Sequence, residues 1–92
     1  MAWRRYVRAM SQRIDPTWRV VASPTTVDGL RCVDLFSRPD GTFGFERFRR
    51  DPEDLGDWTP LGNDSALVFA DLDAAREAAR RVAPEVFDAT SL

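Results

Sequence analysis

The side chains available for chemistry in this chain of 92 residues are few in kind. All 13 basic residues are arginine, and histidine is absent, so neither an imidazole proton shuttle nor a lysine Schiff base can form. The single thiol, Cys32, lies in an apolar run with no histidine to activate it, which favours a buried, inert cysteine. Asp34 and Glu46 form a candidate acid–base pair, although acids beside arginines are more often ion-paired. We therefore expect no enzymatic activity and no cofactor.

The acidic segment 51–65 is the candidate metal site. It can be aligned with a calcium loop of the EF-hand type, with Gly56 at the position where that loop needs glycine. Leu55 and Gly62 then occupy positions that should supply oxygen ligands. We expect a solvated acidic loop and no metal.

Arginines and aromatic residues are interleaved around residues 42–50, and they supply most of the candidate binding residues. Alternating arginine and phenylalanine is typical of sheet surfaces that neutralise phosphates and stack bases. The net charge of −2 counts against nucleic acid, and so does any burial of the phenylalanines in the core. Trp58, in the acidic segment, either covers the core or anchors a partner, and covering the core is favoured. The candidate binding residues are Arg47, Arg49, Arg50 and Trp58.

These side chains must be positioned by a sheet, because hydropathy alternates over several short stretches. Turn signals at 28–29 and 38–41 separate them, and Asp71 is placed to cap a helix. Phe48 has the opposite parity to Phe43 and Phe45, which predicts a bulge or bend near Glu46. The predicted strands are 17–23, 30–37, 42–50 and 66–70, with a further short strand possible at 58–61, and the predicted helix is 72–83, ended by Pro84.

An N-terminal helix is a candidate cover for the second face of this sheet. Trp3, Val7, Met10 and Ile14 fall on one helical stripe. The alternative is that Met10 is the true start and the arginine-rich leader has no partner in the fold.

The predicted fold class is α+β: an antiparallel β-meander of three to four strands, with a C-terminal helix packed on one face. Length predicts a single domain over 1–92, with an N-terminal helical segment (1–16), the meander plus helix (17–84) and a tail (85–92) that packs through Val86 or Phe87 and then frays.

The segment 44–54 (GFERFRRDPED), followed by 58–60 (WTP), resembles small uncharacterised bacterial proteins of the β-meander-plus-helix type. The resemblance covers roughly residues 17–84 and implies a fold but no activity. Over 30–83 the pattern is also loosely similar to the small three-stranded domains that begin phage-type integrases and some hybrid-binding nucleases.

Two function classes stay open at this stage. The first is a small interaction module that meets a protein partner, or a second copy of itself, through a sheet face or edge. The second is a nucleic-acid-binding domain that uses the strand lined by arginine and phenylalanine. No apolar run is long enough to cross a membrane, and a single cysteine favours a cytoplasmic location.

Overall fold

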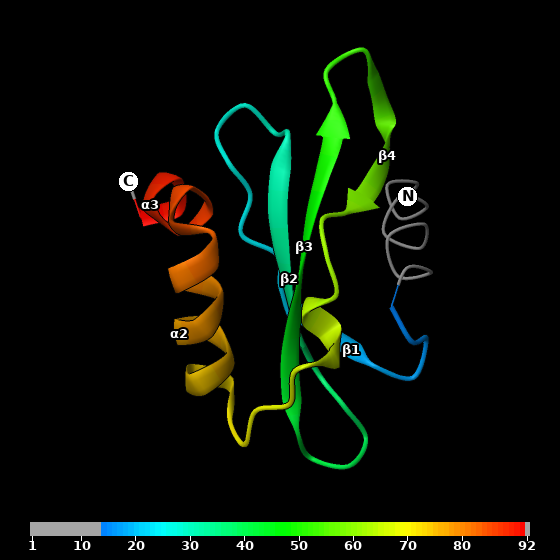
Figure 1. The fold of residues 1–92 in the computed structure, drawn as a ribbon, viewed down its shortest axis with the longest axis vertical. Helices are drawn as coiled ribbons and strands as arrows, with labels where there is room; N and C mark the ends of the chain where they lie inside the picture. The colour runs from blue at the N-terminus through cyan, green and yellow to red at the C-terminus, as the bar shows by residue number, and fades with distance from the viewer. Residues whose placement is uncertain (1–13, 92) are drawn as a thin grey trace.

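The structure of the protein, a computed structural model, describes residues 14–91, and for residues 54, 55 and 89–91 it describes the backbone alone. Four antiparallel strands form one sheet in chain order, and two helices follow (Figure 1). The predicted α+β meander with a C-terminal helix on one face is confirmed. The elements are β1 (Arg19–Ala22), β2 (Arg31–Ser37), β3 (Phe43–Asp51), β4 (Asp54–Pro60), the 3-10 helix η1 (Asp64–Ala66), α2 (Leu72–Val82) and α3 (Pro84–Ser91).

Glycines close the turns between the first three strands. Gly29 has a φ of 75° and Gly41 a φ of 89°, in the left-handed region that glycine enters without steric cost. In the second turn, Asp40 accepts hydrogen bonds from the backbone N–H and the hydroxyl of Thr42, at 3.0 and 2.7 Å. Both turns stand where the Asp-Gly pairs of the sequence predict them.

Helix α2 lies against β2 and β3 because its sheet-facing side carries alanines. Asp71 caps the helix by accepting a hydrogen bond of 2.8 Å from the N–H of Ala74. Ala75 and Ala79 are fully buried, so the helix approaches the sheet closely, as predicted. Together they close the first core, whose buried members are Val33, Leu35, Phe45, Ala75, Ala79, Ala83, Val86 and Phe87.

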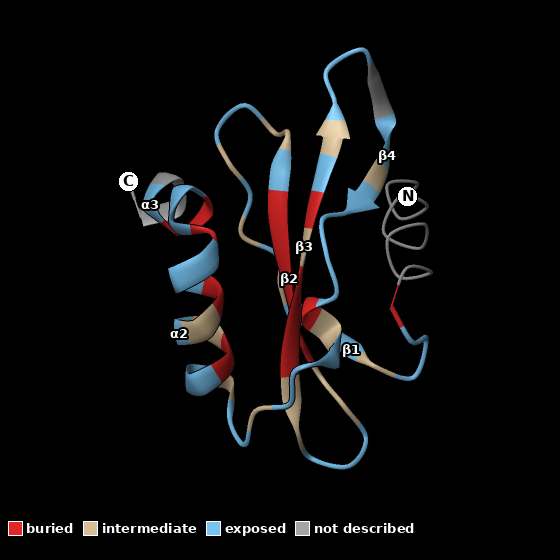
Figure 2. Ribbon diagram, in the orientation of Figure 1, coloured by how far each residue is buried: buried red, intermediate tan, exposed pale blue. Residues whose placement is uncertain are grey.

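The opposite face of the sheet carries a second core. The central parts of β2 and β3 are therefore buried on both sides, as Figure 2 shows. Trp18 stacks on Phe36 with ring centroids 4.8 Å apart, and Trp58 packs against the same cluster. The buried members of the second core are Ile14, Cys32, Phe36 and Phe48.

The bulge predicted near Glu46 is wrong. The register of β2 and β3 is continuous from the pair Arg31 and Arg49 to the pair Ser37 and Phe43. Phe48 lies on the opposite face of the sheet from Phe43 and Phe45. It is buried there because both faces of the sheet carry a core. An irregularity occurs instead between β3 and β4, beyond Arg49.

The acidic segment is a β-hairpin for most of its length. Asp51 pairs with Asp54, and β4 returns along β3 as far as Pro60, so the strand near Trp58 is longer than predicted. The predicted strand 66–70 is wrong, because this stretch makes only one isolated bridge, between Phe69 and Phe43. The apolar composition of residues 66–70 is typical of a strand, but composition does not show whether a partner strand pairs with it.

The structure tests the predictions for the two ends of the chain to different extents. Pro84 ends α2 but also begins α3, where proline is favoured as a first residue, and Val86 and Phe87 are both buried. The expected packing of the tail through Val86 or Phe87 is therefore confirmed, and the backbone continues as helix to Ser91 where fraying was expected. Of the predicted N-terminal stripe, Ile14 is buried in the second core, while Trp3, Val7 and Met10 lie outside the described residues. Neither helix in the described part of the chain has the length and apolar character needed to span a bilayer.

Candidate functional site

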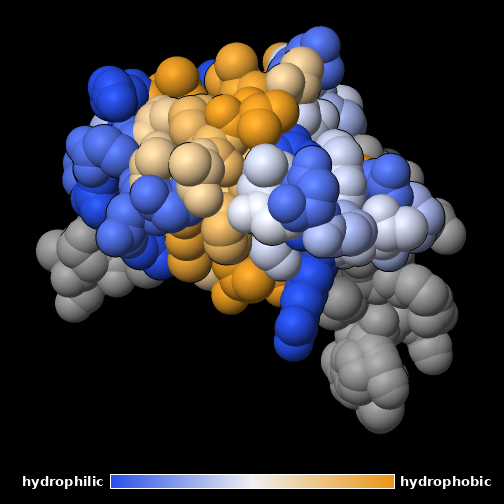
Figure 3. Space-filling view, turned by 90° about the horizontal axis from the view of Figure 1, so that it is seen from below, coloured by the Kyte–Doolittle hydropathy of each residue, from blue (hydrophilic) through white to orange (hydrophobic). Residues whose placement is uncertain are grey.

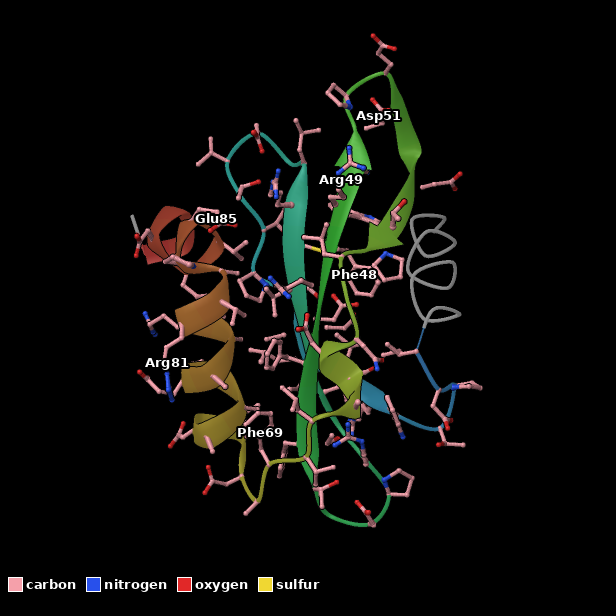
Figure 4. All side chains as sticks on the ribbon, viewed as in Figure 1. Phe48, Arg49, Asp51, Phe69, Arg81 and Glu85 are labelled. Carbon is pink, nitrogen blue, oxygen red and sulfur yellow. The ribbon has the colours of Figure 1, made fainter. Side chains whose placement is uncertain are left out.

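The four predicted binding residues do not form one site, because they divide between the two faces of the sheet. Side chains alternate along a strand, so Arg47 and Arg49 of β3 share a face, and Arg50 lies on the other. Arg49 pairs with Thr59 of β4, which places the neighbouring Trp58 on the same face as Arg50. Figure 4 shows Phe48, also on that side, pointing away from α2.

Arg50 and Trp58 serve the second core. The guanidinium of Arg50 lies 4.4 Å from the centroid of the Trp58 ring, and its Nε donates a hydrogen bond of 2.9 Å to the carbonyl of Gly29. Trp58 is half-buried against the core cluster. Its role as a cover for the core is thus the one the packing supports.

Arg47 is held in place by an acid from η1. Its Nε and Nη2 donate to the two carboxylate oxygens of Asp64 at 2.8 and 3.1 Å, and its backbone N–H donates to the same carboxylate at 3.1 Å. These bonds raise the pKa of Arg47. These bonds fix the position of the Arg47 guanidinium and attach η1, which follows β4, to β3.

Arg31 and Arg49 form an arginine pair that the sequence analysis did not anticipate. The two residues are direct cross-strand partners, and both are exposed. Arg31, Arg47, Arg49 and Val33 lie on one face, which is the face that α2 covers further along the sheet. Recognising the pair requires the strand register, because Arg31 is far from Arg49 in sequence.

A hollow of about 140 Å³ opens beside these arginines, between the sheet and the junction of α2 with α3. Arg31 and Arg47 both line it, and Leu61, which follows β4, contributes apolar surface. The helix junction contributes Val82, Ala83, Glu85 and Val86.

The two acids that the sequence suggested as an acid–base pair are cross-strand neighbours, and both are buried. Asp34 and Glu46 are opposite each other on the second face of the sheet, 0% and 3% exposed. Asp34 accepts a hydrogen bond of 2.8 Å from the hydroxyl of Ser23, and Glu46 accepts one of 2.8 Å from the N–H of Ser65. Burial raises the pKa of Glu46, and the nearby charge of Asp64 adds to that effect. In the described chain, no cluster of three ligating side chains could hold a metal ion.

The segment after η1 is an exposed apolar edge, and we call residues 67–69 the edge segment. The N–H and carbonyl of Phe69 bond to Phe43 at 3.0 and 2.9 Å, on the part of β3 that β4 does not cover. Leu67 and Val68 are 50% and 64% exposed. Seen from the end of the molecule where this segment lies, hydrophobic side chains gather in a central area with hydrophilic ones to either side (Figure 3).

Arg38 is a further anchoring residue that the sequence analysis missed. Its guanidinium donates hydrogen bonds to the carbonyls of Phe43, Ser65 and Leu67, at 2.9, 2.8 and 3.2 Å. The same group lies 4.5 Å from the centroid of the Trp18 ring. Arg38 therefore holds the approach to the edge segment against the sheet.

No known protein family, curated protein or solved structure matches this chain. The resemblance of residues 17–84 to small bacterial proteins stays a prediction.

Proposed function

We propose that the protein is a small interaction module that pairs with a second copy of itself through the edge segment, residues 67–69. The observation that carries this proposal is an exposed apolar stretch with extended backbone beside β3, which is bonded to β3 through Phe69 and to the Arg38 side chain through the carbonyl of Leu67. Unpaired strand edges are templates for pairing with another chain, and proteins usually protect them.

The other edges of the sheet carry such protection. Strand β1 is short, is charged at Arg19, and its register shifts between Val20 and Ala22. Strand β4 is acidic and ends in Pro60. Residues 67–69 contain no charge, no proline and no glycine. An edge that lacks these protective features is available for pairing with another chain.

A second copy fits the edge segment because the segment is complementary to itself. The backbone groups of Phe69 face β3, and backbone direction alternates along an extended chain, so the N–H and carbonyl of Val68 face away from the sheet. A two-fold axis at Val68 brings these groups to the same groups of the second copy, as in other isologous contacts. This register places Val68 opposite Val68 and sets no two acids directly opposite each other.

Sedimentation equilibrium of the full chain, of Val68→Lys and of Val27→Lys tests the proposal. Val27 is the matched control, because it is a valine 86% exposed in the turn before β2. We expect dimers of the wild type and of Val27→Lys. We expect dimerisation at least about tenfold weaker for Val68→Lys, since two ammonium groups would face each other across the axis.

A wild type that stays monomeric at all protein concentrations would overturn self-association. So would a Val68→Lys variant that dimerises as strongly as Val27→Lys.

The structure gives less support to nucleic-acid binding through the Arg/Phe strand. Phe45 and Phe48 are fully buried on opposite faces, and Phe43 packs against the first core. None of the three presents a ring on which a base could stack.

A further inference from the structure

The arginine pair on β2 and β3 is an arrangement that folding alone does not favour. Arg31 and Arg49 are directly opposite each other, and like charges in that relation destabilise a sheet. In the part of the chain that the structure describes, neither residue has a carboxylate within 4.0 Å. Asp28 acts on Arg31 electrostatically, but it forms no ion pair with it. A like-charge pair that costs stability and has no ion-paired carboxylate among the described residues indicates a bound anion.

The adjoining hollow brings a third arginine to the same place. Arg47 lines it together with Arg31, and the two bonds from Asp64 hold the Arg47 guanidinium in a fixed position. Glu85 of α3 also lines the hollow and is exposed. Figure 4 shows Glu85 and Arg49 in the same half of the molecule, away from the edge segment at Phe69.

The charges that line the hollow sum to a positive value, because Arg31 and Arg47 stand against Glu85. Arg49 adds a positive charge beside Arg31, while Asp64 is bonded to Arg47 and Asp28 acts electrostatically on Arg31 from outside the hollow. Leu61 and the α2–α3 junction contribute aliphatic surface to the hollow, and Cys32 and Phe48 also line it. A ligand therefore meets guanidinium groups at one side and aliphatic side chains at the other.

We propose that this hollow binds the phosphate group of a small phosphomonoester. Guanidinium groups bind phosphate through parallel N–H···O bonds, and the oxygens of one phosphate can accept from two arginines at once. Pockets that enclose a whole ligand usually measure about 300–1,000 Å³, so a hollow of about 140 Å³ holds the phosphate while the rest of the molecule lies outside. This site is separate from the edge segment and does not depend on self-association.

Titration of the isotopically labelled full chain, followed by the backbone amide NMR signals, tests the proposal. The probes are phenyl phosphate, inorganic phosphate, acetate and a mixed-sequence DNA octamer. We expect saturable shifts with both phosphates, centred on Arg31, Arg47 and Ala83, and no saturation with acetate over the same concentrations. The two phosphate probes separate binding of the free anion from binding of its ester.

Three variants make the test specific. Arg31→Gln combined with Arg49→Gln should weaken phosphate binding at least tenfold without lowering the melting temperature, because the variant also removes the like-charge pair. Arg19→Gln, an exposed arginine of β1, is the matched control and should bind phosphate as the wild type does. Glu85→Gln should bind phosphate more tightly, because a carboxylate leaves the hollow.

Several outcomes would overturn the phosphate site. These are the absence of saturation with either phosphate, equal binding by acetate, and binding that survives the double substitution. Tighter binding of the DNA octamer than of phenyl phosphate, with a steep loss as salt rises, would show that the arginines serve a nucleic acid instead.

Discussion

Asp34 on β2 and Glu46 on β3 stand directly opposite each other, and both carboxyl groups are buried on the face of the sheet that α2 does not cover. Each is bonded to a different serine, Ser23 or Ser65, at the two sides of the strand pair. Burial raises the pKa of Glu46, and the nearby charge of Asp64 adds to that effect. Glu46 therefore makes the stability of the fold depend on pH.

Glu46→Gln should raise the stability of the fold at neutral pH. Burial raises the pKa of Glu46 above its ordinary value of 4.5, so the unfolded chain ionises first as pH rises, and stability is lost between the two pKa values. The amide oxygen of glutamine can still accept the bond from Ser65. Urea unfolding at several pH values checks this, with exposed Glu77→Gln as control.

The stabilisation by Glu46→Gln should shrink as pH falls toward 4.5 and be smallest below 4.5, where the wild-type carboxyl is protonated in both the folded and the unfolded chain. A variant less stable than wild type at pH 7 would contradict the account, as would a gain that does not vary with pH.

Asp64→Ala should destabilise the protein by about 1–3 kcal/mol, because it removes charge-assisted bonds to both the side chain and the backbone of Arg47. Asp73→Ala is the control, since its contact with Arg76 is 3.5 Å long and the aspartate is 94% exposed, which predicts a change of less than about 0.5 kcal/mol. Equal unfolding free energies for the two variants would show that Asp64 does not anchor η1.

Gly44→Ala should destabilise the protein by about 1–3 kcal/mol through overpacking. A Cβ at Gly44 would lie 2.8 Å from the ring of Phe36, which is itself stacked on Trp18. At Gly62 the nearest atom would be 3.5 Å away, so Gly62→Ala should leave thermal unfolding nearly unchanged. Similar melting temperatures for both variants would mean that the second core is looser than described.

The meander and α2 could be predicted from the sequence because their signals are local. Asp40 and Gly41 specify a turn, and the alanines at 75 and 79 specify the face of α2 that meets the sheet. The hairpin of β3 and β4 was only partly predicted, because acidic residues with proline and glycine are typical of loops. For residues 66–70, the sequence predicts a strand that the structure does not contain. A short apolar run does not show whether a partner strand is free to pair with it.

The candidate surfaces could be predicted less well than the fold. Arg47 and Arg49 were identified from their spacing, but Arg31 joins them only through the register of β2 against β3. Burial on both sides of β3 could not be read from alternation, because alternation indicates a sheet with one solvated face. Alternation along β3 separates Arg50 from Arg47 and Arg49, and the pairing of Arg49 with Thr59 places Trp58 on the side of Arg50.

Disulfide formation by Val68→Cys tests most directly whether the edge segment pairs with a second copy at Val68. Hydrogen-bonded residues on antiparallel strands have Cα atoms about 5.5 Å apart, within the range that a disulfide spans. Cys32 is buried, so the wild type supplies the background, and Val27→Cys supplies the control for an exposed thiol. Under oxidised glutathione, we expect Val68→Cys to form a disulfide-linked dimer in high yield, and Val27→Cys to remain monomeric. Dimer yields from Val68→Cys no higher than those from Val27→Cys would contradict the pairing.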